Sequence, residues 1–356
     1  MIMAGGTGGH VFPALSLAGL LRAHDIEVIW LGTRAGIEAR LVPAAGIDVE
    51  WIDIGGLRGK GLATLLAAPL RLARALWQAL AAVRRYRPRV VVGLGGYVTG
   101  PGGLAAVLAR RPLVIHEQNA VAGFTNRVLA RLATQVLEAF SGSFGSGVKA
   151  TTVGNPVRAE FFALPAPTVR YASRQGALQV LVVGGSQGAQ RLNAVVPEAV
   201  ATLSGKVALR VRHQTGTRTL DTTREAYAAR GITADVSAFI DDIAAAYADA
   251  DVVICRAGAL TVSELAAAGV AAILVPFPAA VDDHQTRNAR FLVDRDAAVL
   301  LPERELTAQR LASELERFAA DRALLCRMAE RARSLARPNA TDELARACLV
   351  AGGLAA

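Results

Sequence analysis

The fold is decided by two similar stretches of sequence, IMAGGTGGH at residues 2–10 and VLVVGGSQGAQ at residues 180–190. Each contains an apolar strand, then Gly-Gly, a hydroxyl residue, another glycine and the predicted start of a helix. Glycine lets the backbone turn sharply and lets a ligand approach closely, and the hydroxyl of Thr7 or Ser186 can cap a helix whose N–H groups face outward. Such a turn favours an anion, above all a phosphate. The alternative is that the glycines only pack strand against helix.

Two common nucleotide-binding motifs are absent from both turns. Neither has the G-x-G-x-x-G spacing of dinucleotide-binding proteins, and neither ends in the Gly-Lys-Ser/Thr of the Walker loop. Dinucleotide-dependent oxidoreduction and ATP hydrolysis are therefore disfavoured.

Short β-branched runs alternate with Ala/Leu/Arg-rich helical segments along all 356 residues, a pattern that predicts repeated βα units. Strands are expected at residues 1–6, 26–32, 49–54, 89–96, 113–118 and 134–140, and again at 179–186, 207–214, 234–240, 251–258, 271–278 and 297–301. Aromatic residues make up only 5% of the chain, which suits parallel sheets covered by helices. The fold class is α/β with two similar halves.

The boundary between the halves is expected in GNPVRAEFFALPAPTVR, residues 154–170, where three prolines separate two strands. Ligands of open α/β sheets bind at the carboxyl ends of the strands. We therefore expect a central cleft faced by the carboxyl edges of both sheets.

The net charge of +9 favours an anionic partner. Nucleic acid is not expected, because zinc-finger spacing, an aromatic RNA-binding signature and long Lys/Arg runs are all missing. The uncharged residues 1–21 are interrupted by glycines and Pro13, so neither a signal peptide nor a membrane span is predicted. Cys255, Cys326 and Cys348 have no paired spacing, which indicates neither disulfides nor zinc, and Cys255 is expected to be an inert core thiol.

Residues 62–89 combine leucines and Trp77 with six arginines. A basic amphipathic helix can lie on an anionic membrane. A core helix with an ordinary solvated face is the equally supported alternative. Pro69 suggests that residues 62–68 form a separate exposed segment.

A family resemblance rests on eight segments, found in order over nearly the whole chain. They are AGGTGGHVFPALSLA (4–18), GLRGKG (56–61), GGYVTGPGGLAA (95–106), HEQNAVAGFTNRVLAR (116–131), VGNPVR (153–158), VVGGSQGAQRLN (182–193), RAGALTVSELAAAG (256–269) and DDHQTRNA (282–289). With them the chain resembles the MurG family of peptidoglycan N-acetylglucosaminyltransferases.

The resemblance implies a GT-B architecture of two Rossmann-like domains. Residues 1–157 would bind the acceptor, residues 158–336 would bind UDP-GlcNAc, and residues 337–356 would form a helix that returns to the first domain. The implied reaction moves GlcNAc to the C4 hydroxyl of the muramyl sugar of lipid I, with inversion, giving lipid II and UDP. No cofactor is implied. The partners would be UDP-GlcNAc, lipid I and an anionic membrane surface, on the cytoplasmic face of the bacterial inner membrane.

The resemblance also implies roles for individual residues. His10 is the candidate base, since imidazole titrates near neutral pH, or else it only orients the loop. Donor contacts are implied for Thr7, Gly8, Gly9, Asn119, Arg158, Ser186, Ile240, Ala259, Leu260, Thr261, Val262, Ser263, Glu264 and Gln285. Acceptor contacts are implied for Gly95, Gly96, Tyr97, Gly100, Gly102, Gly103, Glu117 and Asn126.

Within the donor set, Arg158 and Ser186 would meet the pyrophosphate, the backbone of Ile240 the base, Glu264 the ribose diol and Gln285 the GlcNAc hydroxyls. One departure stands out: where the family has a His-Ala pair, PFPAAVDDHQ has Ala279. Donor affinity could differ for that reason.

A metal-free mechanism is expected. The closest Asp-x-Asp pair, DAD at 249–251, lies at the amino end of a predicted strand, away from the ligand edge, and the adjacent Asp282 and Asp283 are the other candidates. Competing functions are a transferase that glycosylates diacylglycerol, a UDP-GlcNAc epimerase and a non-catalytic membrane scaffold.

Overall fold

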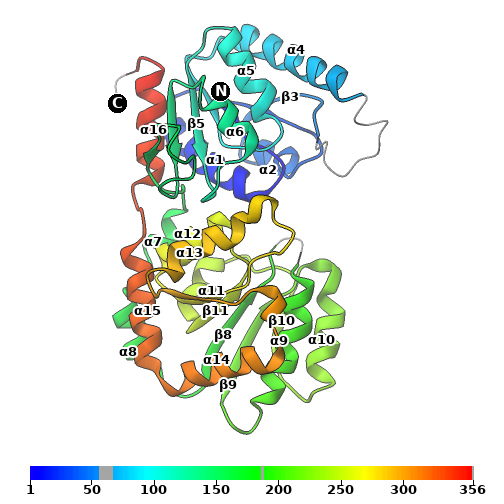
Figure 1. The fold of residues 1–356 in the computed structure, drawn as a ribbon, viewed down its shortest axis with the longest axis vertical. Helices are drawn as coiled ribbons and strands as arrows, with labels where there is room; N and C mark the ends of the chain where they lie inside the picture. The colour runs from blue at the N-terminus through cyan, green and yellow to red at the C-terminus, as the bar shows by residue number, and fades with distance from the viewer. Residues whose placement is uncertain (56–66, 186–187, 355–356) are drawn as a thin grey trace. The chain divides into compact units, whose positions relative to one another are not determined.

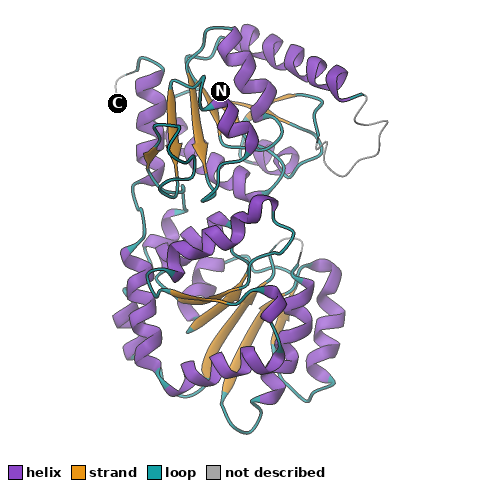
Figure 2. Cartoon of the chain, in the orientation of Figure 1, coloured by secondary structure: helices purple, strands orange, loops and turns teal. Residues whose placement is uncertain are grey.

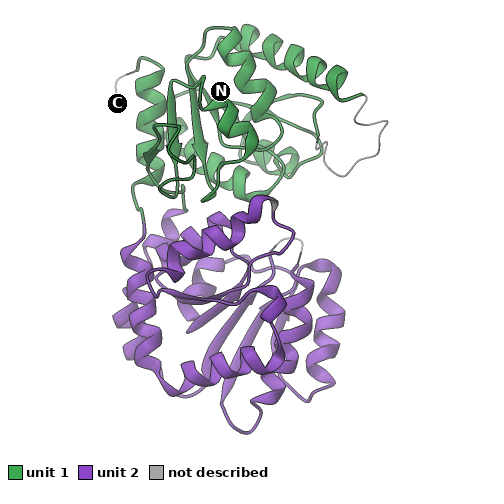
Figure 3. Ribbon diagram, in the orientation of Figure 1, with its two compact units in different colours: residues 1–157, 337–356 green, residues 158–336 purple. Residues whose placement is uncertain are grey.

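The computed structural model describes residues 1–55, 67–185 and 188–354 (Figure 1). The chain divides into two compact units, coloured separately in Figure 3. Unit 1 contains residues 1–157 and 337–356, and unit 2 contains residues 158–336.

Unit 1 is built on a parallel sheet with the strand order β3-β2-β1-β4-β5-β6-β7 among the described residues. The strands are β1 (Ile2–Met3), β2 (Ile29–Gly32), β3 (Asp48–Trp51), β4 (Val91–Gly93), β5 (Leu113–Glu117), β6 (Gln135–Glu138) and β7 (Thr151–Thr152). The helices are α1 (Gly8–Ala23), α2 (Glu38–Ala44), α4 (Ala68–Tyr86), α5 (Thr99–Leu108), α6 (Phe124–Leu129) and α16 (Ala340–Ala351). Among the described strands of unit 1, β7 alone was not predicted, because two threonines make no apolar run.

Strand residues of unit 1 alternate between two hydrophobic cores, as the twofold period of a strand requires. Ile2, Trp30 and Val92 pack with α1 and α16 on one face of the sheet. Met3 and Leu31 belong to the core on the other face, which α4, α5 and α6 cover. Both faces are therefore buried, which explains the continuous apolar runs of the sequence.

Unit 2 repeats the arrangement with the strand order β10-β9-β8-β11-β12-β13, again all parallel. Its strands are β8 (Leu178–Val183), β9 (Leu209–Gln214), β10 (Asp235–Ser237), β11 (Val252–Cys255), β12 (Ala271–Leu274) and β13 (Ala298–Leu300). Its helices are α7 (Ala159–Phe162), α8 (Pro167–Ala172), α9 (Gln190–Thr202), α10 (Leu220–Ala228), α11 (Ile243–Asp249), α12 (Ala259–Ala268), α13 (His284–Val293), α14 (Ala308–Ala320) and α15 (Arg322–Ser334). Helices cover both faces of this sheet (Figure 2).

The predicted α/β class with two Rossmann-like halves is confirmed. In each sheet the first strand lies in the middle, its second and third strands lie to one side, and the fourth follows on the other side. The strand order reverses between β1 and β4 and between β8 and β11. The loops at the carboxyl ends of these strands are where such folds bind ligands.

The last helix, α16, packs against α1 and buries Leu344, Ala345 and Cys348 in the core of unit 1. Cys255 lies buried within β11, and burial raises the pKa of its thiol to about 12. This agrees with the prediction of an inert core thiol.

Candidate active site

In unit 1 the turn after β1 and the loop after β4 are in direct contact. A Cβ atom at Gly95 would lie 2.5 Å from His10 Nδ1, and one at Gly96 would lie 2.3 Å from the carbonyl oxygen of Gly5. Both glycines have positive φ, +105° and +84°. Only glycine fits at these two positions. The structure thus brings the predicted residues His10, Gly95 and Gly96 together at the carboxyl edge of the sheet.

Thr7 is the N-cap residue of α1, but its side chain makes no capping hydrogen bond. Its carbonyl oxygen accepts from the backbone N–H groups of His10 and Val11 at 3.1 and 3.2 Å. The prediction that the Thr7 hydroxyl caps the helix is therefore wrong. The hydroxyl is exposed beside Gly8 and Gly9, the first two residues of α1.

The turn after β1 is anchored by Glu38, a buried residue that sequence reasoning missed. Its carboxylate accepts from the backbone N–H of Gly6 at 2.9 Å, and from the backbone N–H and hydroxyl of Thr33 at 3.1 and 2.7 Å. A glutamate at the start of a helix is common on surfaces, so the sequence holds no signal for this role.

Glu117 organises the loop after β5. Its carboxylate accepts from the backbone and side-chain amides of Asn119 at 2.9 and 3.2 Å, from the Gly123 N–H at 3.1 Å and from Asn126 Nδ2 at 2.9 Å. Glu117 and Asn126 are both buried. These bonds give Glu117 and Asn126 a role in shaping the loop, and their contact with the acceptor stays a prediction.

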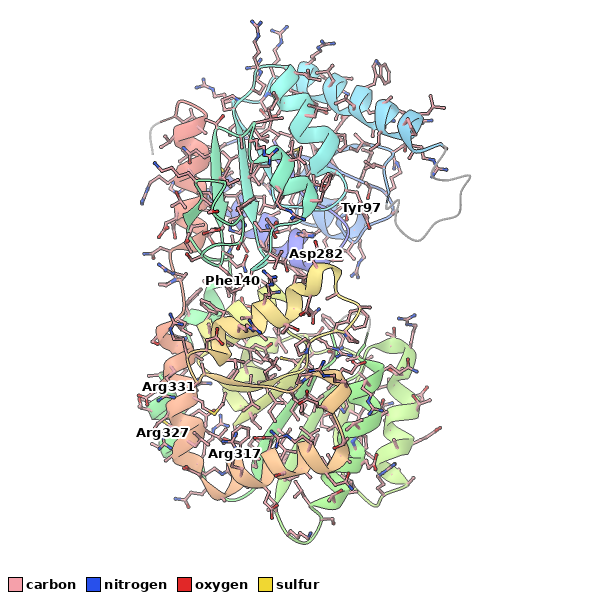
Figure 4. All side chains as sticks on the ribbon, in the orientation of Figure 1. Tyr97, Phe140, Asp282, Arg317, Arg327 and Arg331 are labelled. Atoms are coloured by element: carbon pink, nitrogen blue, oxygen red, sulfur yellow. The ribbon has the colours of Figure 1, made fainter. Side chains whose placement is uncertain are left out.

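The glycines of α5 fall into two groups. A Cβ at Gly102 would lie 2.2 Å from Met3 Sδ, and one at Gly103 would lie 2.7 Å from Leu129 Cδ1, so helix packing explains both. At Gly100 the nearest atom would be Thr125 Cγ2 at 3.5 Å, an ordinary contact. Tyr97, labelled in Figure 4, is exposed and remains a candidate to meet an acceptor.

In unit 2 the buried amide of Gln214 ties two loops together. Gln214 Oε1 accepts from the Gly185 N–H at 2.9 Å, while Nε2 donates to the carbonyls of Gly185 at 3.1 Å and Ala238 at 2.9 Å. The glycine turn after β8 is thereby joined to the loop that carries Ile240. Gln214 was not predicted, and Ser186 lies outside the described residues.

Glu264 lies on α12, the helix that begins at Ala259 just beyond β11. Ala259, Leu260, Thr261, Val262 and Ser263 form its first turns. Burial raises the pKa of Glu264 to about 7, and the positive charge of Arg158 opposes the rise. Among the described residues, Arg158 forms its ion pair with Glu160 rather than with Glu264.

Arg158 is the N-cap residue of α7. Its guanidinium pairs with Glu160 at 2.7 Å and lies over the ring of Phe161, 5.1 Å from the ring centroid. Two predicted donor residues are thus close enough to interact: the charge of Arg158 acts on the pKa of the Glu264 carboxyl.

Gln285 joins the loops after β11 and β12, because its Oε1 accepts from the backbone N–H groups of Ala257 at 3.2 Å and Phe277 at 2.9 Å. It lines a pocket of about 810 Å³ together with Gly188, Arg256 and Phe277. These residues all follow the carboxyl ends of strands, where the sequence predicted a donor. Ala279 is exposed near this edge.

Asp251 lies at the opposite, amino edge of the sheet, as predicted for the DAD segment. It is fully buried and pairs with Arg174 at 2.7 Å and with Arg322. It also accepts from the Gln179 N–H at 2.8 Å. Its carboxylate thus holds together β8, the segment that follows α8 and the start of α15. Across the described ranges, no group of three or more His, Cys, Asp and Glu side chains is placed to hold a metal ion.

Both halves of the chain match models of one protein family. Residues 1–138 match the glycosyltransferase family 28 N-terminal domain, and residues 179–344 match the family 28 C-terminal domain. The chain is 57% identical to a protein of Nitrosococcus oceani over 99% of both chains, and 58% identical to one of Alkalilimnicola ehrlichii over 98% of both. Both are named UDP-N-acetylglucosamine–N-acetylmuramyl-(pentapeptide) pyrophosphoryl-undecaprenol N-acetylglucosamine transferase.

A solved structure of MurG from Acinetobacter baumannii is 42% identical and superposes with a TM-score of 0.85, covering 98% of this chain and 99% of that one. Two sheets of this order, with both family 28 domains in sequence, define a glycosyltransferase of the GT-B fold. Within that class the chain belongs to the MurG family. The resemblance drawn from the sequence is confirmed.

No helix among the described residues is both long and apolar enough to cross a membrane.

Proposed function

We propose that this chain transfers GlcNAc from UDP-GlcNAc to the C4 hydroxyl of the muramyl sugar of lipid I, forming lipid II and UDP. The observation that carries this proposal is 57% identity, over 99% of both chains, to a transferase named for that donor and acceptor. The positions of His10 and Glu264 at the carboxyl edges of the two sheets support it.

The donor binds at the carboxyl edge of unit 2. Glu264 accepts hydrogen bonds from the ribose diol, and the pyrophosphate lies against the turn after β8 and the first turn of α12, where helix N–H groups favour an anion. Arg158 adds a positive charge, and Gln285 presents its amide to the GlcNAc hydroxyls. The helix N–H groups and Arg158 offset the negative charge of the departing UDP.

The acceptor binds in unit 1, where His10 is the general base. As the O4 lone pair forms a bond to C1 of GlcNAc, the hydroxyl proton passes to the imidazole. The bond from C1 to the UDP oxygen breaks, and UDP leaves with that electron pair. Attack from the face opposite the leaving group inverts C1. The imidazole of His10 is half-buried beside the Gly95 loop, so part of it is accessible to a substrate hydroxyl.

The enzyme works at the cytoplasmic face of the inner membrane, held there by α4. One side of α4 buries Ala75, Ala79, Ala82 and Val83 against α5. The other side exposes 78% of Leu70 and 71% of Trp77, next to Arg71 and Arg74. A buried side and an exposed side that is both apolar and basic support a helix that packs on the core and binds an anionic membrane. Pro69 lies in the first turn of α4, and residues 62–66 of the predicted separate segment lie outside the described residues.

Mass spectrometry of the protein with UDP-GlcNAc and a short-chain lipid I analogue tests the proposed reaction. The expected products are the analogue carrying one added GlcNAc and an equal amount of UDP. Glycosylated diacylglycerol, a C2 epimer of the donor, or no product from either substrate would instead support one of the competing functions.

A further inference from the structure

Four groups of unit 1 form a continuous chain of hydrogen-bond contacts that ends at His10. His116 Nε2 lies 2.8 Å from the carbonyl oxygen of Gly154, and His116 Nδ1 lies 3.1 Å from Gln118 Nε2. Gln118 Oε1 lies 3.1 Å from His10 Nδ1. Gln118 is 1% exposed and His116 is fully buried, so solvent does not compete for these contacts.

The direction of each hydrogen bond follows from the Gly154 end. A carbonyl oxygen only accepts, so His116 must carry its proton on Nε2. Burial lowers the pKa of His116, which keeps the ring neutral near pH 7. A neutral ring with its proton on Nε2 has a lone pair on Nδ1. His116 Nδ1 is therefore an acceptor.

The orientation of the Gln118 amide follows in turn. Its Nε2 donates to His116 Nδ1 at 3.1 Å and to the His116 carbonyl oxygen at 3.2 Å. The reversed amide would place an oxygen against these two acceptors, which is repulsive. Since Nε2 must face His116, Oε1 must face His10. An amide oxygen accepts only, so His10 Nδ1 must donate.

We infer that Gln118 and His116 are positioning residues that hold His10 in the Nδ1–H tautomer, so that the lone pair of His10 Nε2 is free to take the acceptor proton. The inference rests on the proposed role of His10 as base. When the imidazole takes up a proton, its Nδ1–H bond to Gln118 stays in place, so proton transfer requires no rearrangement of the loop. The same bond orients the imidazolium that forms.

Other contacts keep this chain rigid. His116 and Gln118 are two residues apart around the end of β5, so their side chains lie on the same side of the strand. Asn155 Nδ2 donates to the Gln118 carbonyl oxygen at 3.1 Å, which fixes the backbone of Gln118. Gly95 of the β4 loop lies next to the His10 ring, because a Cβ atom at Gly95 would come within 2.5 Å of His10 Nδ1.

Nitrogen-15 NMR of the histidine-labelled protein tests the tautomers directly. The chain has five histidines, and the spectra of His10→Asn and His116→Asn assign the two that matter. At about pH 8, where a free imidazole is neutral, we expect a protonated Nδ1 on His10 and a protonated Nε2 on His116. In Gln118→Met, the His10 signals should shift toward the other tautomer. A protonated Nε2 on His10 in the wild type, or His10 signals unchanged in Gln118→Met, would overturn the inference.

Kinetics separate positioning from folding. For metal-bound histidines, loss of the partner that fixes the tautomer typically costs about 10- to 100-fold in metal affinity or activity, and we expect a loss of similar size here. Gln118→Met should therefore lower kcat at least ~10-fold while KM for UDP-GlcNAc stays unchanged. The matched control is Gln78→Met, the same change on α4, where Gln78 bonds to Asp53 and has no contact with His10. It should keep full activity on a water-soluble acceptor.

A double variant decides whether Gln118 acts through His10. Residues that act as one unit are strongly non-additive. His10→Ala with Gln118→Met should be no slower than His10→Ala alone, and a further ~10-fold loss would contradict the inference. An active His10→Ala enzyme would instead refute the base role, while the NMR spectra would still report the tautomer independently.

Discussion

Gly95 and His10 are in contact at the carboxyl edge of the first sheet, and a Cβ atom on Gly95 would lie 2.5 Å from His10 Nδ1. Gly95 also has a φ of +105°. Gly95→Ala should therefore lower kcat by displacing the imidazole and destabilise the fold by about 1 to 3 kcal/mol through backbone strain. Urea unfolding and kcat measure the two effects.

The control for that change is Gly100→Ala in α5, where the added Cβ meets only an ordinary contact at 3.5 Å. Alanine in a helix is about 1 kcal/mol more favourable than glycine, so Gly100→Ala should not destabilise the fold. An equal fall in the free energy of unfolding of the two variants would show that the contact with His10 does not destabilise Gly95→Ala.

His10→Ala tests the general base. We expect kcat to fall about 100-fold or more, because a positioned base contributes that much. The affinity for UDP, measured by calorimetry, should remain as in the wild type, since the proposed main contacts to the ribose and the pyrophosphate lie in unit 2. Turnover within a few-fold of wild type would rule out His10 as the base.

The Glu264 carboxylate should sense the ribose 2′-hydroxyl. The natural donor and its 2′-deoxyribose analogue should differ by about 1.5 to 3 kcal/mol in transition-state binding, the range for a hydrogen bond to a charged group. Glu264→Ala should bring this difference toward zero. Measuring kcat/KM for both donors with both enzymes closes a double-mutant cycle. A coupling energy near zero would assign Glu264 to the helix rather than to the ribose.

Ligand binding should depend on pH through Glu264. The pKa of its carboxyl is raised from 4.5 to about 7 by burial, so the group is mostly protonated at pH 6 and mostly ionised at pH 8. Only the ionised form accepts from both ribose hydroxyls. Uridine, which has no phosphate to titrate, should thus bind about 10-fold more tightly at pH 8 than at pH 6. Glu264→Gln should flatten this dependence, and an equally steep profile in that variant would assign it to another group.

The raised pKa of Glu264 also makes the free energy of unfolding depend on pH. Between about pH 4.5 and 7 the folded state retains the Glu264 proton more than the unfolded state does. The contribution of this group to the free energy of unfolding therefore falls as pH rises through that window.

The exposed side of α4 should bind anionic vesicles. Leu70→Gln, Trp77→Gln, Arg71→Glu and Arg84→Glu together should reduce sedimentation with anionic vesicles, because they remove apolar contact area and positive charge. Activity on a water-soluble acceptor should persist. Arg327→Glu and Arg331→Glu on α15, labelled in Figure 4, make the same change in net charge on unit 2. Equal loss of vesicle binding in both variants would point to net charge rather than to α4.

The sequence alone determined the fold class, the family and most of the residues around the glycine turns. These features are local: apolar runs mark buried strands, and a glycine turn with its following helix lies within about ten residues. His10, Gly95 and Glu264 could be named because each belongs to a segment that resembles the family. Asp251 could be placed at the amino edge of its sheet because it directly precedes an apolar strand.

Only the tertiary structure decided how those residues are held. Gln118 is 108 residues from His10, and Glu38 is 32 residues from Gly6, so no local pattern connects them. That Gly102 and Gly103 let α5 approach Met3 and Leu129 closely could be seen only in the structure. The Thr7 hydroxyl, expected to cap α1, does not. The physical reason is that a hydrogen bond depends on which strand ends lie side by side, and strand order in a parallel sheet is set by packing of the whole unit.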